Sequence, residues 1–386
     1  MKHTHSDKLE QWLGTDKVAQ ISKDFGKFYW PVALHGVPGN VHVMPGGDFC
    51  GEIKASFGKE EGAADVLKKL KRRAEAEFRR HRAFGTLIDM IRAGDSRLAS
   101  VGAFASIDAV VAAYTGGKGQ MAKFSKVGTA SNAIGNCEDL WVATGTPTAG
   151  AAGAAAPGGT AHTSANTGAL GFSNLGTANT GHYLNWALNA SVINNSLLLY
   201  DRLFSVAKTM NSTATEAVTG VPTRYQNGTA GANDYIGGNF CFPMIPTTVL
   251  PATAHNWTVC QYTDQASGTA NSFPVIAGVS ACTVGGMDLV AGKWFMNLAA
   301  GDVGVKALTQ MQASAAIATG TVTFVIGHPI AVNACPIANI ACVDDGLYTA
   351  LNLTSVLDNA CLAFLELQKP ATTATTYSGL LRFVSE

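Results

Sequence analysis

Two different spacings of apolar residues divide this chain. Between residues 59 and 91 a stripe of residues recurs at three- and four-residue steps: Leu67, Leu70, Ala74, Phe78, His81, Phe84, Ile88 and Ile91. That spacing is typical of a long amphipathic helix, although Gly85 interrupts it. Residues 98–114 are rich in small side chains and predict a second helix, which a Gly-rich loop follows.

The pattern changes in the later part of the chain, where apolar segments become short or alternating. They are rich in β-branched and aromatic residues and are separated by Gly, Asn and Asp: SLLLYDRLFSVA, NWTVCQYT, KWFMNL, TGTVTFVIGHPIAV and CLAFLEL. Such segments are typical of strands. We therefore expect residues 127–386 to form β-rich compact domains.

Two segments fit neither pattern. Residues 1–58 combine the Gly/Pro-rich stretches HGVPGN and MPGGDF with aromatic residues that need a partner surface: Trp12, Phe25, Phe28, Tyr29 and Trp30. This composition predicts an extended arm or hairpin with assembly anchors. Residues 144–180 are of low complexity, and their side chains are too small to build a core alone. We expect either a surface loop or an excursion that lies on a neighbour. The predicted division is thus 1–58, 59–126 and 127–386.

Charge is unevenly distributed along the chain. Residues 1–126 contain 20 Lys/Arg and 14 Asp/Glu, whereas the following 260 residues contain only 7 and 13. A typical soluble protein is about 25% charged. Because interface cores are depleted of charge, we interpret the later part as a surface that other subunits cover. The alternative is a monomeric β-domain with a neutral, hydroxyl-rich surface.

The polar face of the predicted 59–91 helix is basic. Its cations include Lys68, Lys69, Arg72, Arg73, Arg79 and Arg80. Such a row could bind the phosphate backbone of DNA without sequence preference, because binding releases condensed counterions. A solvated helix face and a row of salt bridges between subunits remain alternatives.

The sequence offers little catalytic chemistry. Its eight cysteines form no Cys-x-x-Cys motif and mostly adjoin apolar residues, so we expect buried free thiols rather than a zinc site; cross-links formed after release are the alternative. Histidines are isolated, and the Gly-x-Ser-x-Gly motif is absent. We therefore predict no catalytic residue, metal or cofactor, and no enzymatic function. Without a secretory signal or a long apolar run, we expect synthesis in a cytoplasm and no membrane partner.

A series of short phrases resembles virion structural proteins of tailed bacteriophages, in which similar phrases occur in the same order. They are Glu138-Asp139-Leu140-Trp141, Thr167-Gly168-Ala169-Leu170, Leu198-Leu199-Tyr200-Asp201-Arg202-Leu203, Pro222-Thr223-Arg224-Tyr225, Tyr262-Thr263-Asp264-Gln265 and Ala300-Gly301-Asp302-Val303-Gly304-Val305. The resemblance extends over about half of the chain, from residue 136 to residue 329.

The resemblance implies a major capsid protein of the α+β, HK97-like fold, with an amino-terminal arm, an extended loop, a long spine helix and a β-rich remainder. It also implies function as a subunit that self-assembles into an icosahedral capsid shell around phage DNA. The expected partners are many copies of the same chain, a scaffold, a portal, a decoration protein and packaged DNA, and the expected location is the virion.

Other interpretations remain open. A helical amino-terminal region followed by a β-sandwich or barrel is the alternative fold. The corresponding alternative functions are a capsid decoration, tail or fibre protein, or a β-rich module that binds a ligand on its loops.

Overall fold

The computed structural model describes residue 104 and residues 107–130, 132–173, 181–226, 238–345 and 354–385. All of them belong to one compact unit, Ser96–Glu386. The predicted arm, its aromatic anchors and the predicted helix over residues 59–91 lie outside the described residues.

Antiparallel strands build this unit, and most of them belong to two six-stranded sheets. Sheet A has the order β15 (Cys342–Asp345), β5 (Gly181–Ala190), β18 (Thr376–Ser385), β1 (Gly119–Val127) and β3 (Thr144–Thr146), and β16 (Ser355–Val356) also pairs with β5. Sheet B has the order β2 (Glu138–Asp139), β17 (Leu362–Glu366), β6 (Asn195–Thr209), β14 (Thr321–Cys335) and β8 (Phe240–Met244), and β4 (Thr160–Ala161) pairs with β6.

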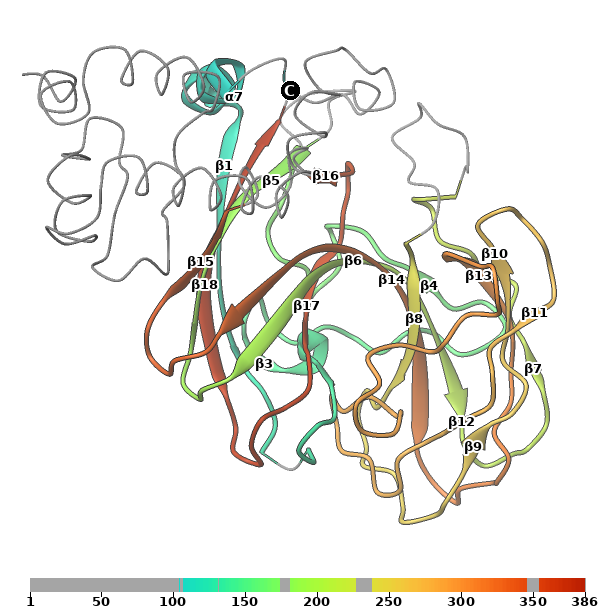
Figure 1. Ribbon diagram of the computed structural model, residues 1–386. Helices are drawn as coiled ribbons and strands as arrows, with labels where there is room; N and C mark the ends of the chain where they lie inside the picture. The colour runs from blue at the N-terminus through green and yellow to red at the C-terminus, as the bar shows by residue number, and fades with distance from the viewer. Residues whose placement is uncertain are drawn as a thin grey trace, which may run out of the picture. The chain divides into compact units, whose positions relative to one another are not determined.

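Two smaller sheets complete the unit. Sheet C has the order β11 (Asn271–Ser272), β10 (Gln261–Asp264), β13 (Val305–Met311) and β7 (Glu216–Ala217), and sheet D pairs β12 (Ile276–Ala277) with β9 (Asn256–Trp257). Figure 1 shows the strands of these sheets gathered beside β8 and β14, away from β1 and β18 of sheet A.

Sheet B is the central layer of the unit. One of its faces packs on sheet A, where Phe364 of β17 stacks on Phe124 of β1 with 4.2 Å between ring centroids. Its other face contributes Phe324 of β14, which meets Trp257 of sheet D at 4.7 Å. Two separate apolar clusters, one on each side of sheet B, form the core. A strand that is covered on both faces needs apolar residues throughout, which explains why β6 is an almost continuous run of buried residues rather than an alternating one.

Helical structure is scarce in the described part of the chain. Its α-helix is α7 (Ile107–Ala113), and a π-helical turn (Tyr114–Lys118) follows it, with Gly117 at φ 90°. A 3-10 turn covers Leu140–Val142. Val110 of α7 packs on Leu184 and Val384 of sheet A.

The predicted α+β, HK97-like fold is wrong. The described residues form β-sheets with one short helix, and no long spine helix occurs among them. In the region assigned to a second helix, residues 107–113 form α7, and the end of the 59–126 segment is strand β1 of sheet A. The HK97-like assignment came from the resemblance, whereas the apolar patterns of the later segments predicted strands, which β6, β14 and β17 confirm.

The low-complexity segment is not a free surface loop over its described residues. The main chain of residues 147–173 is hydrogen-bonded to sheet B, from Ala156 N to Ala207 O at 3.0 Å and from Leu170 N to Leu362 O at 2.9 Å. Small side chains permit this close approach, because a Cβ at Gly153 would overlap the Ser205 hydroxyl. The excursion therefore lies on its own chain.

Candidate functional site

The few charged side chains of the β-rich part point inward. Between residues 127 and 385, ten of the eighteen charged side chains that the structure describes are buried, and only Lys293 and Asp358 are exposed. The buried ones are Glu138, Asp139, Asp201, Arg202, Lys208, Arg224, Asp264, Asp288, Glu366 and Lys369. Charged groups are rarely buried without partners, so this arrangement calls for specific pairing.

One pair joins the edge strand β2 of sheet B to its middle strand β6. Arg202 of β6 donates from Nη1 to Asp139 Oδ2 at 2.6 Å, and both side chains are fully buried. The other Asp139 oxygen accepts from the Tyr200 hydroxyl at 2.9 Å and from Trp141 N at 3.1 Å. The guanidinium carbon also lies 4.7 Å from the centroid of the Trp141 ring, which gives a cation–π contact.

A second pair lies beside the first. Arg224 donates to both Asp201 oxygens, from Nε at 2.8 Å and from Nη2 at 2.6 Å, and its Nη1 donates to His162 O. Asp201 Oδ1 also accepts from Cys361 N at 2.8 Å. These bidentate and main-chain hydrogen bonds hold three parts of the chain together: the residues around Arg224, strand β6, and Cys361 just before β17.

A serine and a histidine meet next to these pairs. His162 Nε2 lies 2.7 Å from Ser205 Oγ, which is the spacing of a base and a nucleophile. Burial, followed by the charges of Arg202 and Arg224, lowers the pKa of His162 to about 2, so its ring is neutral. Both side chains are buried, with exposed fractions of 2% and 0%, and we interpret the contact as structural.

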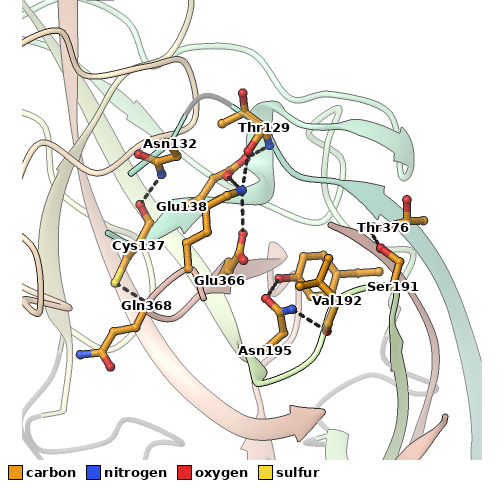
Figure 2. A network of polar contacts seen from close by, with 12 residues as sticks. Thr129, Asn132, Cys137, Glu138, Ser191, Val192, Asn195, Glu366, Gln368 and Thr376 are labelled. Atoms are coloured by element: carbon orange, nitrogen blue, oxygen red, sulfur yellow. Dashed lines mark hydrogen bonds and ion pairs between the residues drawn. The ribbon is translucent and has the colours of Figure 1, made fainter. Parts of the chain in front are cut away.

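The third cluster holds two carboxyl groups and one ammonium group. Glu138 of β2 and Glu366 of β17 occupy directly facing positions of neighbouring strands. Lys369 Nζ lies 3.4 Å from Glu138 Oε2 and 3.9 Å from Glu366 Oε2. Figure 2 shows Glu138 and Glu366 approaching the same point, with Thr129 above them. Burial, followed by the negative charge of Glu366, raises the pKa of Glu138 to about 8.

Several large apolar side chains, in contrast, are exposed on the surface. Large apolar side chains are exposed at scattered positions, among them Val343 (67%), Val275 (65%), Ile134 (61%) and Trp294 (42%). Ile134 and Trp294 lie on segments that a hydrogen bond from Gly292 N to Gly135 O joins. Because more than half of the described charged side chains between residues 127 and 385 are buried, contacts of this surface with other molecules would involve mainly hydroxyl, amide and apolar groups.

The residues that the sequence singled out are not among those that the structure brings together. Trp12, Phe25, Phe28, Tyr29 and Trp30, and the basic row of Lys68, Lys69, Arg72, Arg73, Arg79 and Arg80, all lie outside the described residues. Sequence reasoning missed the buried pairs, although the Tyr-Asp-Arg of β6 was a signal, because it interrupts an apolar strand.

The prediction that the cysteines are mostly buried is confirmed for the residues that the structure describes. Six of the seven described cysteines are buried, and Cys342 is partly exposed. Among the described residues, no group of three His, Cys, Asp or Glu side chains could hold a metal ion. No helix in the same part of the chain is long and apolar enough to cross a membrane.

Comparisons with known proteins identify no family. No family model matches the chain, and no curated protein matches it either. Among solved structures, one similar chain is the VP2 subviral particle of infectious bursal disease virus, at 9% identity over 69% of this chain and 80% of that one. The TM-score of that match is 0.13, so it carries no argument about fold or function.

Proposed function

We propose that this chain is a structural subunit that assembles with many copies of itself into the shell of a virus particle. The observation that carries the proposal is the placement of charge: ten of the eighteen described charged side chains between residues 127 and 385 are buried, and only two of the eighteen are fully exposed. A shell subunit buries much of its surface against neighbours, where charge would be desolvated at a cost. The order of the virion-like phrases in the sequence agrees with this function.

The exposed apolar side chains add to the support. Val343, Val275 and Trp294 are exposed, and contact with a neighbouring subunit would remove their apolar area from water. Closed symmetry uses every edge of a subunit as the binding site of a neighbour. The edge strand β15 of sheet A carries Val343 and is suited to such a contact.

The test is the assembly state of the full chain expressed alone. Sedimentation velocity counts the subunits, and negative-stain electron microscopy of the same sample shows the shape. We expect closed shells, or rings of subunits that are shell intermediates.

A uniform monomer or trimer would contradict the proposal if it persists across protein concentration, ionic strength and added crowding agent. Tubes would indicate a tail protein rather than a shell protein. Small oligomers that bind a glycan or another ligand saturably would indicate a binding module.

A further inference from the structure

The cluster of Glu138, Glu366 and Lys369 is unbalanced in charge. With all three groups ionised, two carboxylates share one ammonium group in a site where the exposed fractions are 2%, 0% and 0%. Like charges at directly facing strand positions repel, and low local dielectric strengthens the repulsion. Two interacting carboxyl groups in such a site retain a proton between them.

Hydrogen bonding leaves room for that proton. Both oxygens of Glu366 are buried and make no well-formed hydrogen bond with the described residues, although the Tyr377 hydroxyl and Lys369 Nζ approach them. Glu138 Oε1 accepts from Thr129 N at 2.6 Å, and Lys369 Nζ donates to Thr129 O. A Cβ at Gly128 would lie 3.3 Å from Glu366 Oε2 and 3.4 Å from the oxygens of Glu138, so the main chain closes tightly over both carboxyl groups.

The neighbouring titratable groups do not supply the missing positive charge. Tyr377 of β18 lies beside Glu366, but its hydroxyl donates to Asn195 Oδ1 at 2.6 Å. Burial, followed by Glu366 and Glu138, raises its pKa, so it stays neutral. Cys137 also faces the cluster, and burial raises the pKa of its thiol to about 11. Lys369 is therefore the cation of this cluster.

The cluster fastens one segment of main chain. Residues 132–138 lead into β2, a two-residue edge strand of sheet B. Besides the cluster, hydrogen bonds from Gly135 N to Lys369 O and from Lys369 N to Asn136 O, both at 2.8 Å, hold this segment against the end of β17. Main-chain hydrogen bonds from Gly292 N to Gly135 O and from Met287 N to Cys137 O, both at 3.0 Å, also join it to residues 287–292, so opening of the segment must break these bonds as well.

We propose that Glu138, Glu366 and Lys369 form a proton-dependent latch that holds residues 132–138 against β17. While the two carboxyl groups share a proton, the segment is closed. When both are ionised, their repulsion weakens the latch, and the segment opens without unfolding of the sheets. The latch belongs to the folded subunit, so it does not depend on the proposed shell function.

Cys137 reports directly on the latch. Its side chain is 1% exposed, and its sulfur accepts from Gln368 N at 3.5 Å and lies 3.6 Å from Lys293 O. Opening of residues 132–138 would break both contacts and expose the thiol. Cys361 is an internal reference, because it is fully buried at the start of β17 and burial raises its pKa to about 12.

The experiment treats the folded chain with N-ethylmaleimide between pH 6 and pH 9 and measures labelling of Cys137 relative to Cys361 by peptide mass spectrometry. Since a proton is released on opening, the ratio should rise by up to about tenfold for each pH unit below the pKa of Glu138 and level off above it. Hydrogen exchange of the 132–138 amides should rise over the same range.

Glu366→Gln keeps the shape of the side chain and removes the repelling charge but not the burial of Glu138, so the rise of the labelling ratio with pH should become clearly weaker than in the unaltered protein. Glu216→Gln is the matched control, because Glu216 pairs with Lys208 at 2.7 Å in another part of the unit, and it should leave the rise unchanged. A flat ratio in the unaltered protein, or a full rise in Glu366→Gln, would overturn the latch.

Discussion

The carboxylates of Asp139 and Asp201 are stable in the interior because their partners replace water. Asp139 receives a guanidinium, a hydroxyl and a main-chain N–H, and Asp201 receives two guanidinium nitrogens and a main-chain N–H. A buried pair of this kind contributes little net stability relative to apolar residues of the same size. Removal of such a pair lowers stability strongly only when one of the two charges remains buried without the other.

Arg202→Met measures the cost of leaving one buried charge without its partner. It leaves the Asp139 carboxylate buried without its ion-pair partner, and we expect the free energy of unfolding to fall by about 3–5 kcal/mol. Adding Asp139→Asn should restore at least about half of the loss, because the amide still accepts from Tyr200 and Trp141 N. Urea unfolding of the single and double variants measures both values.

Lys208→Met is the control for that prediction. Glu216, the partner of Lys208, is 30% exposed, so water can solvate it after the substitution, and the loss should be clearly smaller than for Arg202→Met. Equal losses in the single and double variants at Asp139 and Arg202 would show that the charge left behind is not what destabilises the protein.

At the scale of elements, the glycines of the 147–173 segment determine how closely it packs on sheet B. A Cβ at Gly150 would overlap the Trp141 indole, which its hydrogen bond from Nε1 to Ala151 O at 2.8 Å holds in place. We expect Gly150→Ala to lower the free energy of unfolding by about 1–3 kcal/mol, as overpacking in a core does. Thermal or urea unfolding provides the measurement.

Gly158→Ala is the matched control, since a Cβ at Gly158 meets nothing within 4 Å and the residue belongs to the same segment. It should be neutral, or stabilising by about 0.4–1 kcal/mol through the unfolded state. If both substitutions destabilise equally, then main-chain freedom, rather than close packing, explains why this segment is rich in glycine.

The sequence predicts some of these elements and not others. Alternation and β-branching identify β6 and β14, because those patterns are local. The position of the low-complexity segment depends on contacts with β6 and β17, which no local pattern encodes. The same holds for the clusters, in which Glu138 and Lys369 are 231 residues apart. The HK97-like prediction rested on a resemblance of short phrases and is wrong, whereas the local patterns of residues 127–386 correctly predicted β-rich structure.

At the scale of the whole molecule, scarcity of charge is visible in the sequence, but its placement is not. A charge-poor chain could put its few ionic groups on the surface to remain soluble. Between residues 127 and 385, ten of the eighteen charged side chains that the structure describes lie inside instead, among them the pairs Arg202–Asp139 and Arg224–Asp201. The surface that remains is suited to association, and the proposed shell follows from that distribution rather than from any single residue.

A charge placed on that surface should therefore block assembly without unfolding the subunit. We expect Val343→Glu on β15 and Trp294→Glu to keep their unfolding free energy within about 0.5 kcal/mol, because both side chains are exposed. Each should raise the protein concentration at which particles form by at least about tenfold, since every copy carries an unpaired charge into its contacts. Asp358→Lys changes charge at an exposed site that is already charged and should assemble normally. If both glutamate variants form particles at the concentration of the unaltered protein, these apolar residues are not contacts of a shell, and the uncharged surface needs another explanation.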